Sequence, residues 1–166
     1  NRIAGETLFD FKLVSVSGDP AITTCGLPVA VSGKFDPADK TDVIVVIAGF
    51  GTQGYATAGF LQGLRRAARS ARAFGGVEAG TWLVARAGLL EGRAATTHWE
   101  DMEDFAAAFP DTDVRPDRYV IDGPVFTRER NGDAGGDVVE RRTDIASKKI
   151  AGAQGNQRDR DARPLH

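Results

Sequence analysis

The chain is poor in cysteine and has no long hydrophobic segment. Cys25 is the one cysteine among 166 residues, which excludes an intrachain disulfide and a cysteine-rich metal cluster and suits a reducing compartment. The strongly apolar run at residues 43–48 is far shorter than the roughly 20 residues that cross a bilayer. The first residues lack the pattern of a signal peptide. These absences predict a cytoplasmic protein without a membrane partner.

An excess of basic charge is also missing. The chain has 21 Lys and Arg residues against 23 Asp and Glu residues, and its formal net charge is −2. A protein that binds DNA through its phosphates usually has a basic surface, and no helix-turn-helix pattern is visible here. We therefore expect no direct DNA binding by this chain.

No motif indicates a cofactor or a metal ion. Residues 49–54 formally match the dinucleotide fingerprint G-x-G-x-x-G, but the acidic residue expected about 20 positions later is missing. Asp101, Glu103 and Asp104 suit the start of a helix, where acidic side chains complement the helix dipole. We expect neither a bound cofactor nor a metal site.

The chain does contain alternating β-type and helical segments. The β-branched run at residues 43–48 predicts a strand covered on both faces of a parallel sheet. Residues 58–74 have helical spacing, with an apolar side opposite a row of arginines that we interpret as a solvated face. Further strands are expected at residues 9–16, 28–31, 75–77, 93–98, 118–122 and 125–127, and further helices at residues 81–90 and 99–109. Such alternation predicts an α/β domain with a mostly parallel sheet.

The composition changes sharply near residue 128. The segment that follows is dense in Arg, Asp, Gly and Gln and has no aromatic residue. Low apolar content of this kind predicts disorder or weak helicity. We therefore expect a domain over residues 1–126 and a polar tail over residues 127–166.

A sharp turn between a strand and a helix is the most informative local feature. Residues 75–82 read Gly-Gly-Val-Glu-Ala-Gly-Thr-Trp, which predicts a short strand, a tight turn and a helix, with Glu78 at the apex. This is the arrangement of a nucleophile elbow, in which the apex residue has strained backbone geometry. An acid at the apex favours binding over acyl transfer, because a carboxylate is a poor nucleophile for that reaction.

The sequence around this turn resembles a known superfamily. The residues that carry the resemblance are the elbow at 75–80, the run AGLL-GR-AT-HW within residues 87–99, Phe109-Pro110, and RYVIDG at 118–123. They are similar to the class I glutamine amidotransferase-like superfamily, and most of all to the ThiJ/PfpI-type domain of AraC-family transcriptional regulators. The resemblance implies a flavodoxin-like three-layer sandwich that senses a small nitrogenous metabolite or mediates dimerisation. In these regulators, DNA binding belongs to a C-terminal pair of helix-turn-helix units.

Three departures from the family pattern are visible. Glu78 stands where the enzymes of the superfamily have their nucleophilic cysteine. The first strand and helix of the domain are expected before Asn1 and are not found in the chain. A polar segment follows Thr127 in place of a small-residue loop and an apolar helix. We expect a partial domain, truncated at both ends, and a frameshift is one hypothesis for the tail.

The candidate ligand site is built around the elbow. We expect Glu78 to act as the counter-ion of a cationic ligand such as a guanidinium or quaternary ammonium group, with cation–π support from Trp82 or Trp99. Ala79, Gly49, Gly51, His98 and Trp99 complete the predicted site, because they follow strands or adjoin the turn. The alternative is that Glu78 only satisfies backbone N–H groups at a helix start, and that His98 only makes a hydrogen bond at a strand end.

Three interpretations of function remain from the sequence. The leading one is a non-catalytic ligand-sensing or dimerisation domain of a bacterial AraC-family regulator, without its DNA-binding region and homodimeric when intact. The second is an amidase-like or hydrolase-like enzyme of the same superfamily. Such an enzyme needs a nucleophile, and Glu78 is the only candidate at the elbow. The third is a non-functional gene fragment.

Overall fold

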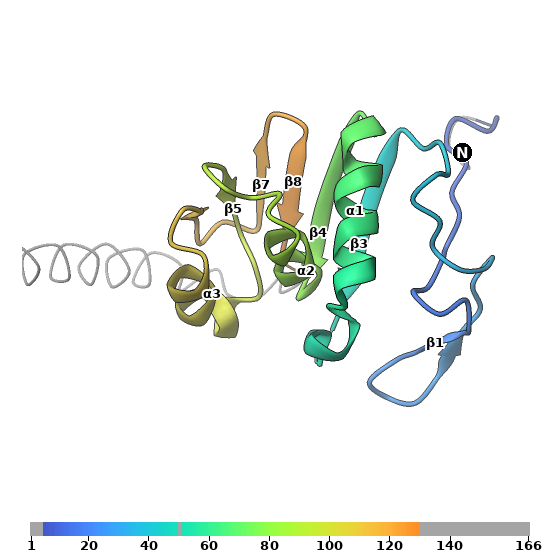
Figure 1. Cartoon of the computed structure of the whole chain (residues 1–166), viewed down its shortest axis with the longest axis horizontal. Helices are drawn as coiled ribbons and strands as arrows, with labels where there is room; N and C mark the ends of the chain where they lie inside the picture. The colour runs from blue at the N-terminus through green and yellow to red at the C-terminus, as the bar shows by residue number, and fades with distance from the viewer. Residues whose placement is uncertain (1–4, 50, 130–166) are drawn as a thin grey trace, which may run out of the picture.

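The computed structural model describes residues 5–49 and 51–129 and has an α/β fold with a mixed sheet (Figure 1). The main sheet has four strands in the order β3-β4-β8-β7. These strands are β3 (Val43–Ala48), β4 (Ala73–Glu78), β8 (Val125–Arg128) and β7 (Tyr119–Asp122). β3, β4 and β8 are parallel, and β7 pairs antiparallel with β8. The expectation of an α/β domain with mostly parallel pairing is confirmed.

Short ladders and helices surround this sheet. β1 (Ala21–Ile22) pairs antiparallel with β2 (Pro28–Val29), and β5 (Ala94–Ala95) pairs parallel with β6 (Asp113–Val114). The helices are α1 (Ala58–Ser70), α2 (Gly80–Arg86) and α3 (Met102–Ala108), with 3-10 turns η1 (Thr52–Tyr55) and η2 (Trp99–Asp101). No helix among the described residues has the length and apolar character needed to span a membrane.

The hydrophobic core lies between one face of the sheet and the helices α1, α2 and α3. Val84 of α2 and Val125 of β8 are each 1% exposed, and Leu90 and Phe105 are fully buried. Ile44 and Val46 of β3 pack against the same cluster. This core lies on one side of the sheet and packs α2 against β4, so it also positions the turn between them.

α1 is an amphipathic helix that ends earlier than the sequence pattern predicts. Its first turn is capped by Thr57, whose Oγ1 accepts the N–H of Phe60 at 3.3 Å. Its arginines are exposed, as expected for a solvated face: Arg65, Arg66 and Arg69. The predicted extension to residue 74 is wrong, because the backbone becomes extended at Ala71 and β4 begins two residues later.

β3 matches its predicted bounds, but its predicted burial on both faces is wrong. Val43, Val45 and Ile47 are 50%, 46% and 67% exposed, whereas Ile44 and Val46 face the core. α1 and α2 lie on one side of the sheet (Figure 1). Among the described residues, nothing comparable covers the other side.

The strand predicted at residues 9–16 is not formed. Within the described residues this segment forms one isolated β-bridge, between Ser15 and Lys34, and Phe9 and Phe11 are 74% and 85% exposed. A strand requires a neighbour that accepts its backbone hydrogen bonds. Backbone hydrogen bonds do join residues 13–15 to residues 32–35, with the Ser32 N–H donating to the Leu13 carbonyl at 2.6 Å, but this pairing does not extend into a regular strand.

Several other predicted elements are shorter than expected. β5 covers two residues of the strand predicted at 93–98, and α2 stops at Arg86, with Gly88 at φ 70° shortly after the helix end. The helix predicted at 99–109 is divided into η2 and α3. The predicted tail, apart from residues 127–129, lies outside the described residues.

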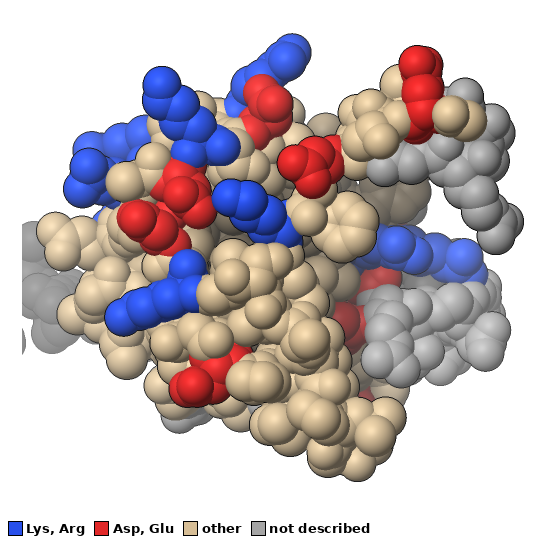
Figure 2. All heavy atoms as spheres, turned by 90° about the vertical axis from the view of Figure 1, so that its right-hand side faces the viewer, with Lys and Arg blue, Asp and Glu red and all other residues tan. Residues whose placement is uncertain are grey.

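The hairpin of β1 and β2 forms an uncharged part of the surface. Figure 2 shows most charged side chains in the upper part of this face and few in its lower part. Residues 20–31 contain no Lys, Arg, Asp or Glu. Ile22 and Leu27 in this hairpin are 68% and 64% exposed.

Candidate functional site

The turn between β4 and α2 has the strained geometry predicted for an elbow. Glu78, at the apex, has φ 58° and is the one residue other than glycine with a positive φ in the described part of the chain. β4 ends at Glu78 and α2 begins at Gly80, so Ala79 alone joins strand and helix. A left-handed residue between a strand and a helix is the geometry of a nucleophile elbow.

Three glycines allow the backbones around this turn to approach closely. A Cβ on Gly75 would overlap the carbonyl oxygen of Phe126, and a Cβ on Gly80 would overlap that of Val46. A Cβ on Gly76 would lie 2.5 Å from Cα of Thr81. A side chain at any of these positions would force the backbone apart, so the glycine-rich sequence of the elbow is a packing requirement.

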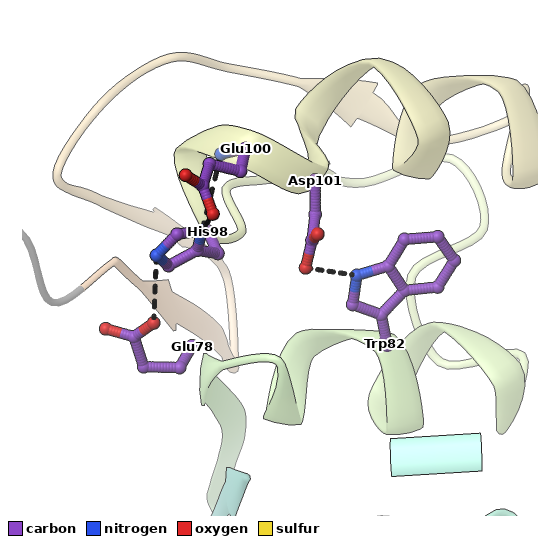
Figure 3. Close-up of polar contacts among 5 residues, drawn as sticks. All are labelled: Glu78, Trp82, His98, Glu100 and Asp101. Carbon is purple, nitrogen blue, oxygen red and sulfur yellow. Dashed lines mark hydrogen bonds and ion pairs between the residues drawn. The ribbon is translucent and has the colours of Figure 1, made fainter. Parts of the chain in front are cut away.

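His98 faces Glu78 from the loop that follows β5 (Figure 3). Its Nε2 lies 3.9 Å from Oε2 of Glu78, and the two side chains are 20% and 17% exposed. Its Nδ1 accepts the N–H of Glu100 at 3.3 Å, which places the proton of a neutral imidazole on Nε2, toward the carboxylate. Because 3.9 Å exceeds a hydrogen-bond distance, the two groups are near enough to contact one ligand without being closed on each other.

One oxygen of the Glu78 carboxylate has no donor among the described residues. Oε1 is buried and makes no hydrogen bond, and the same holds for the hydroxyls of Thr81, Thr96 and Thr97. Buried polar atoms in proteins are almost always hydrogen bonded, and a buried charge without a partner is especially costly. The arrangement therefore favours a ligand that brings N–H donors or positive charge to Oε1.

Trp82 and Trp99, the two predicted aromatic neighbours of Glu78, lie in different positions. Trp99 stacks on His98, with ring centroids 5.8 Å apart and planes inclined by 30°. The indole N–H of Trp82 donates to Asp101 at 3.3 Å, on the side of α2 away from Glu78 in Figure 3, and Arg86 lies over the Trp82 ring. Trp99 is therefore the aromatic side chain associated with the Glu78–His98 pair.

The remaining predicted site residues lie at the carboxyl edge of the sheet. Ala48 of β3 pairs with Glu78 in the parallel register, so Gly49 leaves the sheet beside the elbow. Gly51 has φ 79° and is exposed, with open space where a Cβ would be. Ala79 makes no side-chain cap to α2. The topology thus brings Gly49, Ala79 and Glu78 to one edge, while their role in binding stays a prediction.

The threonines near Glu78 were not among the predicted site residues. Thr81 lies one helical turn after Glu78, and Thr97 immediately precedes His98. The Thr-Thr pair before the histidine is visible in the sequence. Threonine is common in strands, however, so the pair does not by itself indicate buried hydroxyls. Their hydroxyls become noteworthy only because the structure buries them without partners.

Cys25 lies in the β1–β2 hairpin, remote in sequence from the elbow, and is exposed. The Thr23 hydroxyl, 3.2 Å from Sγ, and the backbone of Leu27 lower the pKa of the Cys25 thiol.

Two hollows lined by described residues lie away from the elbow. One of about 190 Å³ is lined by Ala85, Glu91 and residues 108–112. The other, of about 540 Å³, lies beside the arginine face of α1 and includes Pro37 and Arg66. Neither includes Glu78 or His98, so a ligand at the carboxylate would rest against the elbow and the loop that holds His98.

Comparisons with known proteins give a consistent family assignment. The model of the DJ-1/PfpI family matches residues 4–135. The HTH-type transcriptional regulator CdhR of Pseudomonas aeruginosa is 35% identical over 120 residues, which are 72% of this chain and 36% of the regulator. The HTH-type transcriptional regulator GlxA of Rhizobium meliloti is 30% identical over 128 residues, which are 76% of this chain and 40% of that regulator.

A solved structure supports the same fold. An AraC family transcriptional regulator from Pseudomonas putida superposes with a TM-score of 0.67 at 24% identity, over 76% of this chain and 69% of that chain. Against the two curated relatives, the chain spans well under half of their length.

Proposed function

The chain belongs to the DJ-1/PfpI family, and on this basis we propose that it is a non-catalytic ligand-binding domain of an AraC-type transcriptional regulator. Its ligand is a small cationic nitrogen compound held by Glu78. The observation that carries the proposal is the buried Oε1 of Glu78, which has no donor among the described residues. A cationic group placed there would remove the cost of that unpaired oxygen.

The residues around Glu78 suit recognition of a cation. His98 directs Nε2 toward the same carboxylate from 3.9 Å, and Trp99 stacks beside His98 and offers an aromatic face. The buried hydroxyls of Thr81 and Thr97 could accept or donate further hydrogen bonds. A cation bound at Oε1 would thus meet one charge, one aromatic group and neutral polar groups.

A hydrolase or amidase is the second candidate function. The elbow geometry and the nearby histidine favour it, because enzymes of the superfamily use an apex nucleophile with a histidine beside it. The identity of the apex residue disfavours it, since a glutamate does not readily form acyl-enzyme intermediates. The printed names of the curated relatives, both HTH-type transcriptional regulators, also support the binding function.

In the proposed regulator, DNA binding and homodimer formation are properties of the whole protein. The chain spans 36% and 40% of the two curated relatives, so a helix-turn-helix part belongs elsewhere in such a protein. The net charge of −2 gives this chain no electrostatic basis for binding DNA directly.

Thermal unfolding with a pair of matched ligands tests the proposal. Choline and its neutral isostere 3,3-dimethylbutan-1-ol have similar shapes and differ in charge, and methylguanidinium provides a second cation. At a ligand concentration ten times the dissociation constant, binding stabilises the folded state by about 1.4 kcal/mol, which raises Tm by roughly 3–8 °C for a domain of this size. We expect this shift for at least one cation and none for the neutral alcohol.

Two variants give the controls. Glu78→Gln keeps the size of the side chain and should abolish the cation-induced shift. Glu91→Gln removes an exposed acid that lines the separate hollow beside residues 108–112, and it should leave the shift unchanged. Equal shifts in wild type and Glu78→Gln would disprove the role of the carboxylate. Amide or ester hydrolysis that is lost in Glu78→Gln would instead establish the enzyme.

A further inference from the structure

Four arginines lie in a segment of the chain that has no acidic residue. Residues 43–77 contain Arg65, Arg66, Arg69 and Arg72 and no Asp or Glu, although the whole chain has a net charge of −2. The first three belong to α1 and are exposed. A helix face that is merely solvated usually mixes the two signs, because opposite charges three or four residues apart stabilise the helix. The charged surface of α1 has one sign only.

The arginines of α1 lack carboxylate partners in the described structure. Arg72, beyond the helix, lies 4.0 Å from a carboxylate oxygen of Asp42, but no described acid is within ion-pair distance of Arg65, Arg66 or Arg69. Arg69 follows the other two by four and three residues, and like charges at these spacings destabilise a helix. An anion bound among the three guanidiniums would relieve this repulsion.

The hollow of about 540 Å³ beside α1 has room for such an anion. We call it the arginine hollow. α1 forms one side, and the loop that carries Pro37 forms the other. A Cβ on Gly63 would lie 3.4 Å from the Pro37 ring, so loop and helix are in contact there, whereas a Cβ on Gly59 would meet no atom within 4 Å. The volume is within the range of about 300–1,000 Å³ that is usual for small-molecule sites.

The side chains around the arginine hollow are hydrogen-bond donors. Arg65, Arg66 and Arg69 line it together with the amide of Gln62, and none of its described lining residues is Asp or Glu. Each guanidinium is permanently charged and has five N–H donors. Arg65 uses one of its donors on the carbonyl of Ala87, at 3.4 Å, which holds its side chain against the neighbouring helix end. The lining therefore suits a ligand with several acceptor oxygens and negative charge.

Phosphate matches these donors better than a carboxylate does. A carboxylate brings one negative charge and two oxygens. A phosphate group brings a charge of about −1.5 to −2 at neutral pH and three strong acceptor oxygens, and it accepts paired hydrogen bonds from arginine. A single phosphate can therefore contact two guanidiniums at once, and two linked phosphates can contact three.

We propose that the arginine hollow binds a small phosphate-bearing ligand through Arg65, Arg66 and Arg69. The ligand enters beside Gly59, where α1 has no side chain, and its phosphate oxygens accept N–H groups of the guanidiniums and of Gln62. The hollow shares no residue with the Glu78–His98 pair, and its charge is opposite to that of Glu78. It is thus a second site, which does not depend on the proposed binding of a cation.

Isothermal titration calorimetry of the full chain with inorganic pyrophosphate tests the proposal. Sulfate and citrate, at matched ionic strength, are the comparison anions, and the salt concentration is kept at about 50 mM, where exposed charges are only partly screened. We expect one pyrophosphate per chain, bound about tenfold more tightly than sulfate and also more tightly than citrate, because its two linked phosphates concentrate charge and acceptor oxygens.

Substitutions separate the hollow from a general effect of positive charge. Arg66→Gln and Arg69→Gln should each raise the dissociation constant for pyrophosphate about tenfold, because each removes a charge-assisted contact. Gly59→Leu keeps every charge but fills the hollow from an open position, and it should weaken binding by a similar factor while leaving the helix intact, since leucine favours helix more than glycine does. Arg72→Gln is the matched control, because Arg72 does not line the hollow.

Several results would overturn the proposal. Wild-type chain that shows no heat of binding with millimolar pyrophosphate would do so, and so would equal affinity for sulfate, which indicates unspecific attraction of anions. Tighter binding of citrate would assign the hollow to carboxylates. Full binding by folded Gly59→Leu, or an equal loss in Arg72→Gln, would place the anion on the exposed helix surface outside the hollow. Circular dichroism verifies that each variant is folded.

Discussion

At the scale of single residues, Glu78 combines an unfavourable backbone with an unsatisfied side chain. Its φ of 58° lies in the left-handed region, which costs a residue with a Cβ roughly 1–2 kcal/mol. Its Oε1 is buried without a partner in the described structure. Sites that accept such costs are typically functional, since strain persists only where the surroundings impose it.

The backbone strain can be measured separately from the carboxylate. Both Glu78→Ala and Glu78→Gly remove the side-chain charge, but only glycine adopts a positive φ without strain. We therefore expect Glu78→Gly to be more stable than Glu78→Ala by about 1–2 kcal/mol in denaturant unfolding. An alanine variant as stable as the glycine variant, or more stable, would contradict the left-handed geometry.

The Cys25 thiol provides a prediction about pH. The hydroxyl of Thr23 lowers the pKa of Cys25, so the reactive thiolate is more populated at neutral pH than in an ordinary cysteine. Thr23→Val should raise this pKa and slow the reaction of Cys25 with a disulfide reagent near neutral pH. The two rates should converge at a pH well above both pKa values. A rate at neutral pH that is unchanged or faster would contradict the assigned cause.

The positions of two residues of this candidate site could be predicted from the sequence. Glu78 at the turn and His98 opposite it followed from the strand–turn–helix pattern and the family resemblance, and the structure brings them to 3.9 Å. The tautomer of His98 and the buried hydroxyls of Thr81 and Thr97 depend on three-dimensional contacts. No spacing in the sequence encodes those contacts.

At the scale of elements, the elbow is held by close backbone contacts at glycine. Gly80 begins α2 against the carbonyl of Val46 in β3, where a Cβ would overlap that oxygen. Gly59 in α1 has open space around its Cβ position. The two glycines therefore have opposite expected responses to the same substitution.

Gly80→Ala should destabilise the protein by about 3 kcal/mol or more, because the overlap with the Val46 carbonyl forces α2 away from β3. Gly59→Ala should leave stability unchanged or raise it by up to about 1 kcal/mol, because alanine is the better helix former. Urea unfolding of both variants checks the pair. A Gly80→Ala variant as stable as Gly59→Ala would contradict the close approach of helix and strand.

Element types were more predictable than burial and pairing. The β-branched run of β3 predicts a strand with the correct bounds, and this strand forms because it pairs with β4. Residues 9–16 have equally good β-forming composition, but in the described structure their pairing is limited to short contacts between residues 13–15 and residues 32–35. Local propensity decides whether a segment can be a strand, whereas the presence of a neighbour decides whether it becomes one.

At the scale of the whole molecule, the α/β architecture and the DJ-1/PfpI family were both predicted from sequence and confirmed. The one-sided core was not predicted. The continuous β-branched run of β3 predicts burial on both faces, but Val43, Val45 and Ile47 are exposed. Which face of a sheet is covered depends on where α1 and α2 pack, and this is a property of the assembled fold.

In the proposed regulator this chain binds the ligand and another part binds DNA, which gives a further prediction. Because this chain has a net charge of −2 and spans 36–40% of the curated relatives, it should not retard duplex DNA in a gel at physiological salt. Binding to DNA would depend on contacts to phosphates and would weaken steeply with salt. Salt-sensitive, tight binding by this chain alone would contradict that division.

A crystal structure of the chain with the cation that stabilises it most, choline or methylguanidinium, would show directly whether Glu78 holds the ligand. We expect the cationic group within about 6 Å of Oε1 of Glu78, beside His98 and Trp99. Density for the cation at another site, with the Glu78 carboxylate unchanged and unoccupied, would contradict the claim that Glu78 binds the ligand.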